Sequence, residues 1–253
     1  MSLVNSIRRS SIEALESNYL YANIYSDYLD KPLVLYFSEA AKKWLYNYKS
    51  TKQIESFKLS KIKYDIQILD DYFYIIYYCY VYVIPDLLMI KNLLLKKNKN
   101  ILNIGAGLAY HDIFVSQINP EIKNFNIIEK TELEHSDEYS STSNREKKIN
   151  ILELSKKNIL DNKRFEKFSF FDEFNYSSII LKFDLIFSFR SWCYKYEIET
   201  YLEFMLNCLS DDGYLIVDIR NDFEKEKILQ KFISVNILAE YKNHKRYVLK
   251  SFR

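Results

Sequence analysis

The chain has 253 residues, of which 48% are hydrophobic, and its formal net charge is +2. This length and apolar content suffice for a packed core, which excludes a chain that is disordered as a whole. The near-neutral charge excludes a broad nucleic-acid-binding face, because such faces carry a strong excess of Lys and Arg. We therefore expect the short basic run at 96–99 to be a solvated surface.

Three features favour a cytoplasmic protein that neither spans a membrane nor binds a metal. The opening sequence MSLVNSIRRSSIEALE lacks the apolar core of a signal peptide. The tyrosine-rich run at 72–84 is too short to cross a bilayer as a helix, so we expect buried packing, with an interfacial anchor left open. Cys79, Cys193 and Cys208 lack metal-ligand spacing, and no other cluster has metal-ligand character.

The first 96 residues contain no glycine and show mostly helical patterns. They have too many apolar faces for a free tail, and a small-molecule site needs shelter from water. We therefore expect a helical N-terminal cap or extension (1–96), packed over the carboxyl ends of the strands in a second domain (97–253).

Strand and helix patterns alternate through residues 97–253. The expected strands are 99–104, 124–129, 165–171, 183–189, 214–219, 235–241 and 246–251. The expected helices are 110–118, 149–160, 195–209 and 223–232, with a polar loop at 131–148 and a turn at 210–213. The run 183–189 is apolar on both faces, as a central parallel strand must be. The last two strands share a short turn, so the pattern predicts a doubly wound α/β sheet ending in an antiparallel hairpin.

The stretch NIGAGLAYHD (103–112) contains two of the three glycines in the chain. Glycine gives access to positive φ and to close backbone approach. A strand that ends in such a turn and enters a helix presents backbone amides to a ligand. Glu129 ends the next strand, 24 residues after Gly105, and an acid there can bind both ribose hydroxyls. These features together predict a nucleoside ligand.

A dinucleotide is disfavoured as that ligand. Its fingerprint has a third glycine three residues after the second, where this chain has Tyr110, whose side chain would obstruct close packing of helix and strand. A terminal hairpin also fits poorly with a sixth parallel strand.

The motifs NIGAG, Glu129, FDLIFSF and DDGYLIVDI, in this order and spacing, resemble the class I S-adenosylmethionine-dependent methyltransferases over residues 97–253. This resemblance implies a seven-stranded, mostly parallel sheet ending in such a hairpin, with S-adenosylmethionine as cofactor. More narrowly, IIEKTE, FDLI-S-x-x-SW and LIVDIR resemble sugar O-methyltransferases encoded with bacterial surface-polysaccharide genes. That implies methyl transfer to a hydroxyl group of a sugar or sugar nucleotide, with no nucleic-acid partner and with self-association left open.

The resemblance also implies a role for each matching residue. The glycine loop would pass beneath the methionine and ribose, Glu129 would hold the ribose hydroxyls, and Asp172 would bind the adenine amino group. The implied cofactor-binding residues are Asn103, Gly105, Ala106, Gly107, Glu129, Lys130, Phe171, Asp172, Ser188, Phe189 and Arg190.

The chain departs from the family pattern at three places. Asn103 replaces an acid before the loop, and Ala109 replaces a common third glycine. Related sequences continue from the SW segment toward a histidine, where this chain has CYKY (193–196). A base is therefore missing or relocated, and the alternative is a weak or inactive nucleoside-binding protein that retains the fold.

A sugar hydroxyl generally needs a general base, and the sequence offers three catalytic candidates. His111 lies at the helix start and is either a base or a capping residue, while Asp112 fits a helix-start acid. Trp192, with Tyr194, either stacks on a sugar ring or belongs to the core. Asp218 ends the fifth strand and would pair with Arg220, in the acceptor pocket or as a structural ion pair. A nucleic-acid methyltransferase is disfavoured by the balanced charge and the missing Asn-Pro-Pro-Tyr-type motif.

Overall fold

A computed structural model describes residues 11–14, 20–24, 33–36, 78–94, 99–131, 150–162 and 165–252. The loop expected at 131–148 lies almost wholly outside the described residues, as does the first half of the tyrosine-rich run. Residues 78–83 of that run are helical, and Cys79 and Val83 are fully buried. No helix among the described residues is both long and apolar enough to span a membrane.

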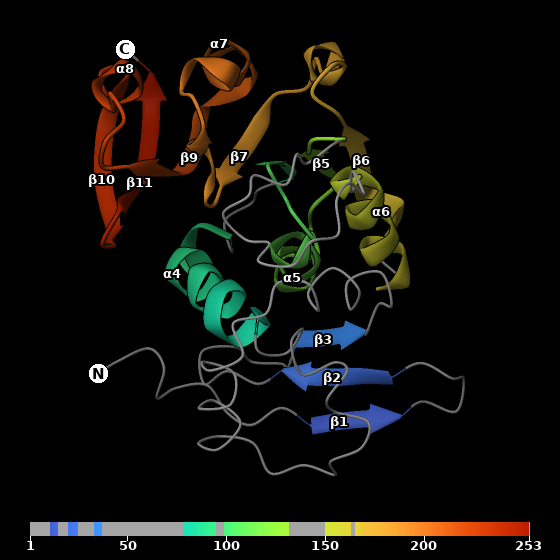
Figure 1. The fold of residues 1–253 in the computed structure, drawn as a ribbon. Coiled ribbons are helices and arrows are strands. Elements are labelled where there is room, and N and C mark those ends of the chain that lie inside the picture. Colours follow the sequence, from blue (N-terminus) through green and yellow to red (C-terminus); the bar gives the residue numbers. More distant parts are fainter. Residues whose placement is uncertain are drawn as a thin grey trace, which may run out of the picture.

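The core of the fold is one twisted sheet of seven strands (Figure 1). Its strands are β4 (Asn100–Ile104), β5 (Asn124–Ile128), β6 (Phe168–Phe171), β7 (Phe183–Ser188), β9 (Leu209–Arg220), β10 (Phe232–Glu240) and β11 (His244–Phe252), in the order β10-β11-β9-β7-β4-β5-β6. The first five are parallel, and β11 pairs antiparallel with both β9 and β10. The predicted fold class, a mostly parallel sheet with a terminal hairpin, is confirmed.

The chain reverses its direction across this sheet beside β4. It runs outward from β4 through β5 and β6, then returns to the opposite side of β4 as β7. Such a reversal leaves a crevice beyond the carboxyl ends of the two central strands, where ligands of open α/β sheets bind. The loop that follows β4 lies at this point.

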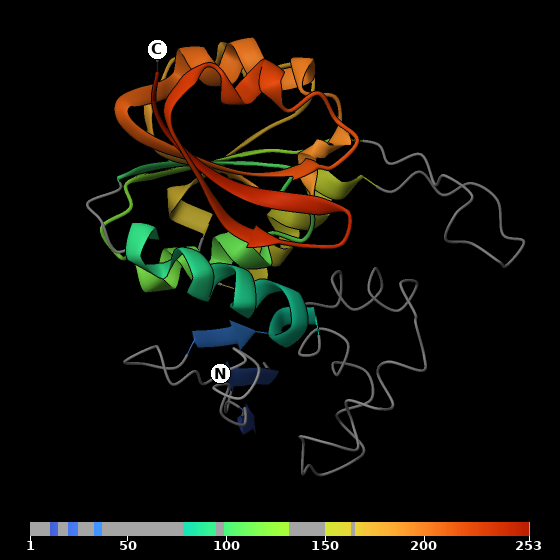
Figure 2. The ribbon, with the colours of Figure 1, turned by 90° about the vertical axis from the view of Figure 1, so that its left-hand side faces the viewer.

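Helices cover both faces of the sheet (Figure 2). One face carries α4 (Ile84–Leu94), α5 (Tyr110–Ile118) and α6 (Ile151–Asp161), and the other carries α7 (Glu199–Cys208) and the short α8 (Glu226–Leu229). Leu185 and Phe187 of β7 pack with the first layer and Ile186 with the second, which explains why this strand is apolar on both faces.

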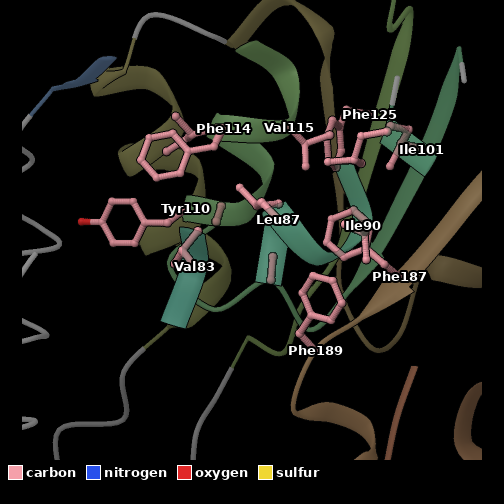
Figure 3. Packing of buried hydrophobic residues seen from close by; sticks show 14 of the residues in the cluster. Val83, Leu87, Ile90, Ile101, Tyr110, Phe114, Val115, Phe125, Phe187 and Phe189 are labelled. Atoms are coloured by element: carbon pink, nitrogen blue, oxygen red, sulfur yellow. The ribbon is translucent and has the colours of Figure 1, made fainter. Parts of the chain in front are cut away.

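Phenylalanine side chains fill the layer between the sheet and α4 and α5 (Figure 3). Phe125 and Phe187 meet edge to face, with ring centroids 6.2 Å apart, and Ile90 and Val115 contact the same cluster from the two helices. Burial of one such side chain stabilises the fold by about 1.5–3 kcal/mol. This packing fixes the position of α5 beneath the loop that follows β4.

Several element boundaries differ from the sequence pattern. Residues 191–196 form a strand, β8 (Ser191–Tyr196), and the helix expected at 195–209 begins only at Glu199. The predicted turn at 210–213 lies within β9, and the helix expected at 223–232 is reduced to α8. Two residues before the expected helix, Cys193 has a positive φ of 62°, a conformation that non-glycine residues rarely adopt.

The expected helical N-terminal extension is helical at residues 78–94, but it is wrong for three other described segments. β1 (Ser11–Ala14), β2 (Leu20–Ile24) and β3 (Leu33–Tyr36) form a separate antiparallel sheet. Val34 exchanges hydrogen bonds of 2.8 and 2.7 Å with Gln117, at the end of α5 remote from the glycine loop. These strands lie on the outer side of α4 and α5 and not over the carboxyl ends of the large sheet (Figures 1 and 2).

Candidate active site

The glycine loop connects β4 to α5 and contains three residues with positive φ, Gly105 (80°), Gly107 (58°) and Ala109 (57°). A Cβ atom on Gly105 would lie 2.3 Å from the Cβ of Ser191, so the protein itself fills that space. A Cβ atom on Gly107 would meet nothing within 4 Å. We expected both glycines to make room for a ligand, but only Gly107 leaves such room.

Glu129 follows β5 and holds the glycine loop by its backbone. Its Oε2 accepts a hydrogen bond of 2.6 Å from the amide of Gly107, and its Oε1 accepts one of 2.8 Å from the amide of Lys130. Burial raises the pKa of Glu129, against the effect of these two amides. A carboxylate can accept about four hydrogen bonds. Glu129 can therefore bind the loop and still accept from two ligand hydroxyls.

Two polar side chains of α6 hold the same loop by its carbonyl groups. Ser155 Oγ donates to the carbonyl of Gly107, and Asn158 Nδ2 donates to that of Leu108 over 2.5 Å. Both side chains are fully buried. Neither residue was predicted to belong to the site, although polar residues three apart on the apolar face of a helix are a usable signal.

Asn103 does not stand alone where the family pattern has an acid. Its Nδ2 lies 2.8 and 2.9 Å from the two carboxyl oxygens of Asp112, in the first turn of α5. Burial raises the pKa of Asp112 to about 7, because the hydrogen bond from Asn103 offsets only part of the desolvation. A carboxyl group is thus present next to the loop, but Asp112 supplies it and not the residue at position 103.

The residues expected around adenine lie at the ends of β5 and β6. Phe171 ends β6, and its carbonyl accepts from the amide of Glu129 over 3.0 Å. The Asp172 carboxylate accepts from its own turn, from the amides of Phe174 and Asn175 and from the Asn175 side chain. If adenine binds here, its amino group would have to donate to a carboxylate that already accepts hydrogen bonds from this turn.

Ser188 and Phe189, at the end of β7, contact β4 and β11. Ser188 Oγ donates to the carbonyl of Ile104 over 2.7 Å and accepts from the amide of Trp192, so it ties β7 to β4. The Phe189 ring lies 4.1 Å from the guanidinium carbon of Arg246. Ser188 and Phe189 thus lie at the predicted edge of the sheet.

Trp192 does not line a ligand site. It is fully buried, and its indole N–H donates to the carbonyl of Ile198. Its ring packs edge to face against Tyr201 of α7. The catalytic candidate Trp192 is therefore a core residue.

A buried ionic network crosses the carboxyl edge of the sheet. Arg246 Nε and Nη2 donate to the two oxygens of Asp218 over 2.6 and 2.8 Å, and its Nη1 donates to Asp86 of α4 over 2.7 Å. The expected pair of Asp218 and Arg220 is wrong, because Arg220 pairs with Asp222. Asp86 and Arg246 carry no local sequence signal, since they are 160 positions apart.

The second oxygen of Asp86 binds two further predicted site residues. It accepts from Arg190 Nη2 over 2.7 Å and lies 3.1 Å from His111 Nε2. Burial alone would raise the pKa of Asp86, but the His111 hydrogen bond and the charges of Arg246 and Arg190 hold it well below its ordinary value. Burial also lowers the pKa of His111. His111 is thus a neutral donor at Nε2, which leaves that nitrogen unable to act as a base.

No family model matches the chain, and no curated protein matches it. The fold is similar to the O-methyltransferase TomG of tomaymycin synthesis from Streptomyces achromogenes, solved with S-adenosylmethionine (13% identity, TM-score 0.49, 85% of this chain and 90% of that chain). It is also similar to an O-methyltransferase from Bacillus cereus, solved with S-adenosylhomocysteine (10%, TM-score 0.45, 86% and 92%). A third similar structure is the ribosomal protein L11 methylase of Lactobacillus delbrueckii subsp. bulgaricus (16%, TM-score 0.46, 66% and 77%).

Proposed function

We propose that this chain is an S-adenosylmethionine-dependent methyltransferase that acts on a hydroxyl group of a small molecule. The observation that carries the proposal is the loop at the switch point of the sheet. There Gly107 leaves open space beside its Cα, while its amide is held by Glu129 from the neighbouring strand. An acid at this strand end is the group that recognises a ribose.

The residues present fit S-adenosylmethionine better than a dinucleotide. Tyr110 begins α5 and is buried among apolar residues of α4 and α5, so close glycine-mediated packing at this position does not occur. The hairpin β10–β11 occupies the side of β9 where a further parallel strand would lie. Both features agree with the methyltransferase resemblance of the sequence.

Bound S-adenosylmethionine would supply a methyl group activated by its sulfonium. Glu129 would hold the ribose, the loop at 105–107 would lie beneath the methionine and ribose portions, and Phe171 and Asp172 would lie beside adenine. Ser188, Phe189 and Arg190 would line the transfer face. Methyl transfer is an in-line displacement, so the fixed placement of these groups supplies much of the catalysis.

A sugar or sugar nucleotide in surface-polysaccharide synthesis is the proposed acceptor, and the enzyme would act in the cytoplasm. The sequence resemblance of IIEKTE, the SW segment and LIVDIR supports this class.

Calorimetry with S-adenosylhomocysteine tests the cofactor assignment. Glu129→Ala should weaken binding by about 1.5–3 kcal/mol, the range for hydrogen bonds to a charged group. Glu129→Gln should lose less, because an amide oxygen still accepts. Glu121→Gln, at an exposed position, is the matched control and should bind as wild type does. If the wild-type protein binds neither S-adenosylmethionine nor S-adenosylhomocysteine, the proposed function is wrong.

Glu129→Ala should also lower stability, which the sequence alone does not suggest. The carboxylate is buried and accepts hydrogen bonds from two backbone amides. Its removal leaves backbone N–H groups without an acceptor, which lowers the free energy of unfolding by about 1–3 kcal/mol. Affinities should therefore be measured well below the unfolding temperature.

Transfer of a labelled methyl group to free hexoses and UDP-hexoses tests the acceptor class separately.

A further inference from the structure

His244 is a buried histidine that no predicted role explains. It is the first residue of β11 and lies opposite Arg220, the last residue of β9, at the carboxyl edge of the parallel strands. Its exposed fraction is 5%. Its Nε2 has no hydrogen-bond partner among the described residues. An unsatisfied buried nitrogen is destabilising, so its retention calls for a ligand or a chemical role.

The neighbouring side chains determine which ring nitrogen carries the proton. Asn243 Nδ2 donates to the Tyr194 hydroxyl over 2.9 Å, which leaves Asn243 Oδ1 facing His244 Nδ1 at 2.9 Å. An amide oxygen can only accept, so His244 Nδ1 must donate. In the neutral ring, Nε2 then has a free lone pair.

The surroundings keep the His244 ring neutral. Burial lowers the pKa of His244, the charges of Arg246 and Arg190 act in the same direction, and Asp218 and Asp86 oppose them. The rings of Tyr241 and Tyr194 pack on it, with centroids 4.3 and 5.0 Å away. Asp218 Oδ2 lies 3.8 Å from Nε2, which is too far for a hydrogen bond but close enough to stabilise an imidazolium.

His111, the other described histidine at this edge, has the opposite arrangement. Its Nε2 proton is donated to Asp86, whereas the Nε2 of His244 is bare. The relocated base that the sequence called for is therefore better matched by His244.

We propose that His244 Nε2 accepts the proton of the hydroxyl group that is methylated, an inference that rests on the proposed function. As the hydroxyl oxygen bonds to the methyl carbon, the carbon–sulfur bond breaks and its electron pair stays on sulfur. The O–H proton passes to Nε2. The products are a methyl ether, the neutral thioether S-adenosylhomocysteine and an imidazolium ion beside Asp218, which later releases its proton to solvent.

Nitrogen NMR of the imidazole rings tests the protonation state without any acceptor. The chain has three histidines, His111, His135 and His244, so single His→Gln variants assign the spectrum. At neutral pH we expect His244 to carry its proton on Nδ1 and His111 on Nε2. A proton on Nε2 of His244 would overturn the proposal.

Kinetics of His244→Gln test the catalytic step, with S-adenosylmethionine as donor and hexoses and UDP-hexoses as acceptors. The variant should bind S-adenosylhomocysteine as wild type does but transfer methyl groups about a hundredfold or more slowly. The wild-type rate should rise with pH through the pKa of His244, and the variant should lack this step. Unchanged transfer, or a parallel loss of S-adenosylhomocysteine binding, would refute the role. Absence of cofactor binding in wild type would instead refute the proposed function.

Discussion

A methyl group added at Gly105 would lie 1.7 Å from Ser191 Oγ, whereas one added at Gly107 would lie in open space. Both positions have positive φ, so an alanine at either is strained by about 1 kcal/mol. The difference between them is therefore steric. Because Gly105 has no side chain, Ser191 of β8 can pack against it. Because Gly107 has no side chain, the space beside the loop stays open.

This contrast predicts opposite balances of stability and binding in two alanine variants. Gly105→Ala should lower the free energy of unfolding by at least about 2 kcal/mol, because overpacking adds about 1–3 kcal/mol to the strain. Gly107→Ala should cost only about 1 kcal/mol but should lose most of its affinity for S-adenosylhomocysteine. Urea unfolding and calorimetry on both variants give the two quantities.

A second substitution provides the control for the first. Ser191→Gly removes the atoms that the new Cβ would meet, so it should restore part of the stability lost in Gly105→Ala. Without such recovery, the collision with Ser191 is not what requires glycine at this position.

Asp112 should make stability depend on pH. Its pKa is raised on folding from 3.8 to about 7, so the folded protein holds a proton that the unfolded chain has lost. Stability due to this group therefore falls as the pH rises from about 4 to about 7, and is constant above that. Asp112→Asn should be increasingly more stable than wild type over this window, as measured by urea unfolding at several pH values. A pH-independent difference would contradict the raised pKa.

At the scale of elements, α6 fixes the conformation of the glycine loop through hydrogen bonds. Ser155 and Asn158 bind the carbonyls of Gly107 and Leu108, while Glu129 binds the amide of Gly107. The backbone of the loop is thus held from two elements before any ligand arrives. Preorganisation of this kind raises affinity because less ordering remains to be done on binding.

Removal of one of these hydrogen bonds should weaken cofactor binding, although the side chain that is removed does not contact the cofactor. Asn158→Ala leaves the buried carbonyl of Leu108 unpaired, so we expect a loss of about 1–3 kcal/mol in stability and a measurable loss in S-adenosylhomocysteine affinity. Lys157→Ala, at an exposed position of the same helix, should change neither. Equal affinities for both variants would mean that the loop holds its shape without α6.

The elements differ in how far the sequence predicts them. The helix expected at 110–118 is confirmed as α5, because apolar spacing, a glycine turn before it and Asn119-Pro120 after it all agree. Residues 191–196 could not be predicted as a strand. Their conformation includes the positive φ of Cys193 and the contact of Ser191 with Gly105, and neither has a local signal. The short strands β1–β3 have too few residues for their pattern to differ from a helical one.

At the scale of the molecule, Asp86 connects three separate parts of the chain. It receives hydrogen bonds from Arg246 of β11, from Arg190 after β7 and from His111 of α5. The sequence identified Arg190 and His111 as site residues but not the carboxylate between them. Contacts over 104 and 160 positions arise from the complete fold, so local spacing cannot reveal them.

Asp86→Asn should therefore be among the most damaging single changes in the chain. It removes the charge that faces two buried or half-buried guanidinium groups, and breaking a buried ion pair costs about 3–5 kcal/mol. Glu153→Gln breaks the exposed pair with Lys156 and should cost at most about 0.5 kcal/mol. Chemical unfolding of the two variants compares them, and a similar small loss in both would show that the network contributes little.

The terminal hairpin has a consequence for the order in which the protein folds. Within the seven-stranded sheet, β10 pairs only with β11, and β11 joins the pair to β9. Docking of the hairpin on β9 brings Arg246 and His244 to Asp218. Arg246 and Asp218 are only 28 positions apart, whereas Ile101 of β4 and its partner Leu185 of β7 are 84 positions apart. Contacts that are closer along the chain form faster. We therefore expect β9 to pair with the hairpin before β4 pairs with β7, so that stopped-flow refolding monitored at the hairpin would precede that monitored at the central strands. The proposed base and Asp218 would then be in place before the two halves of the site meet.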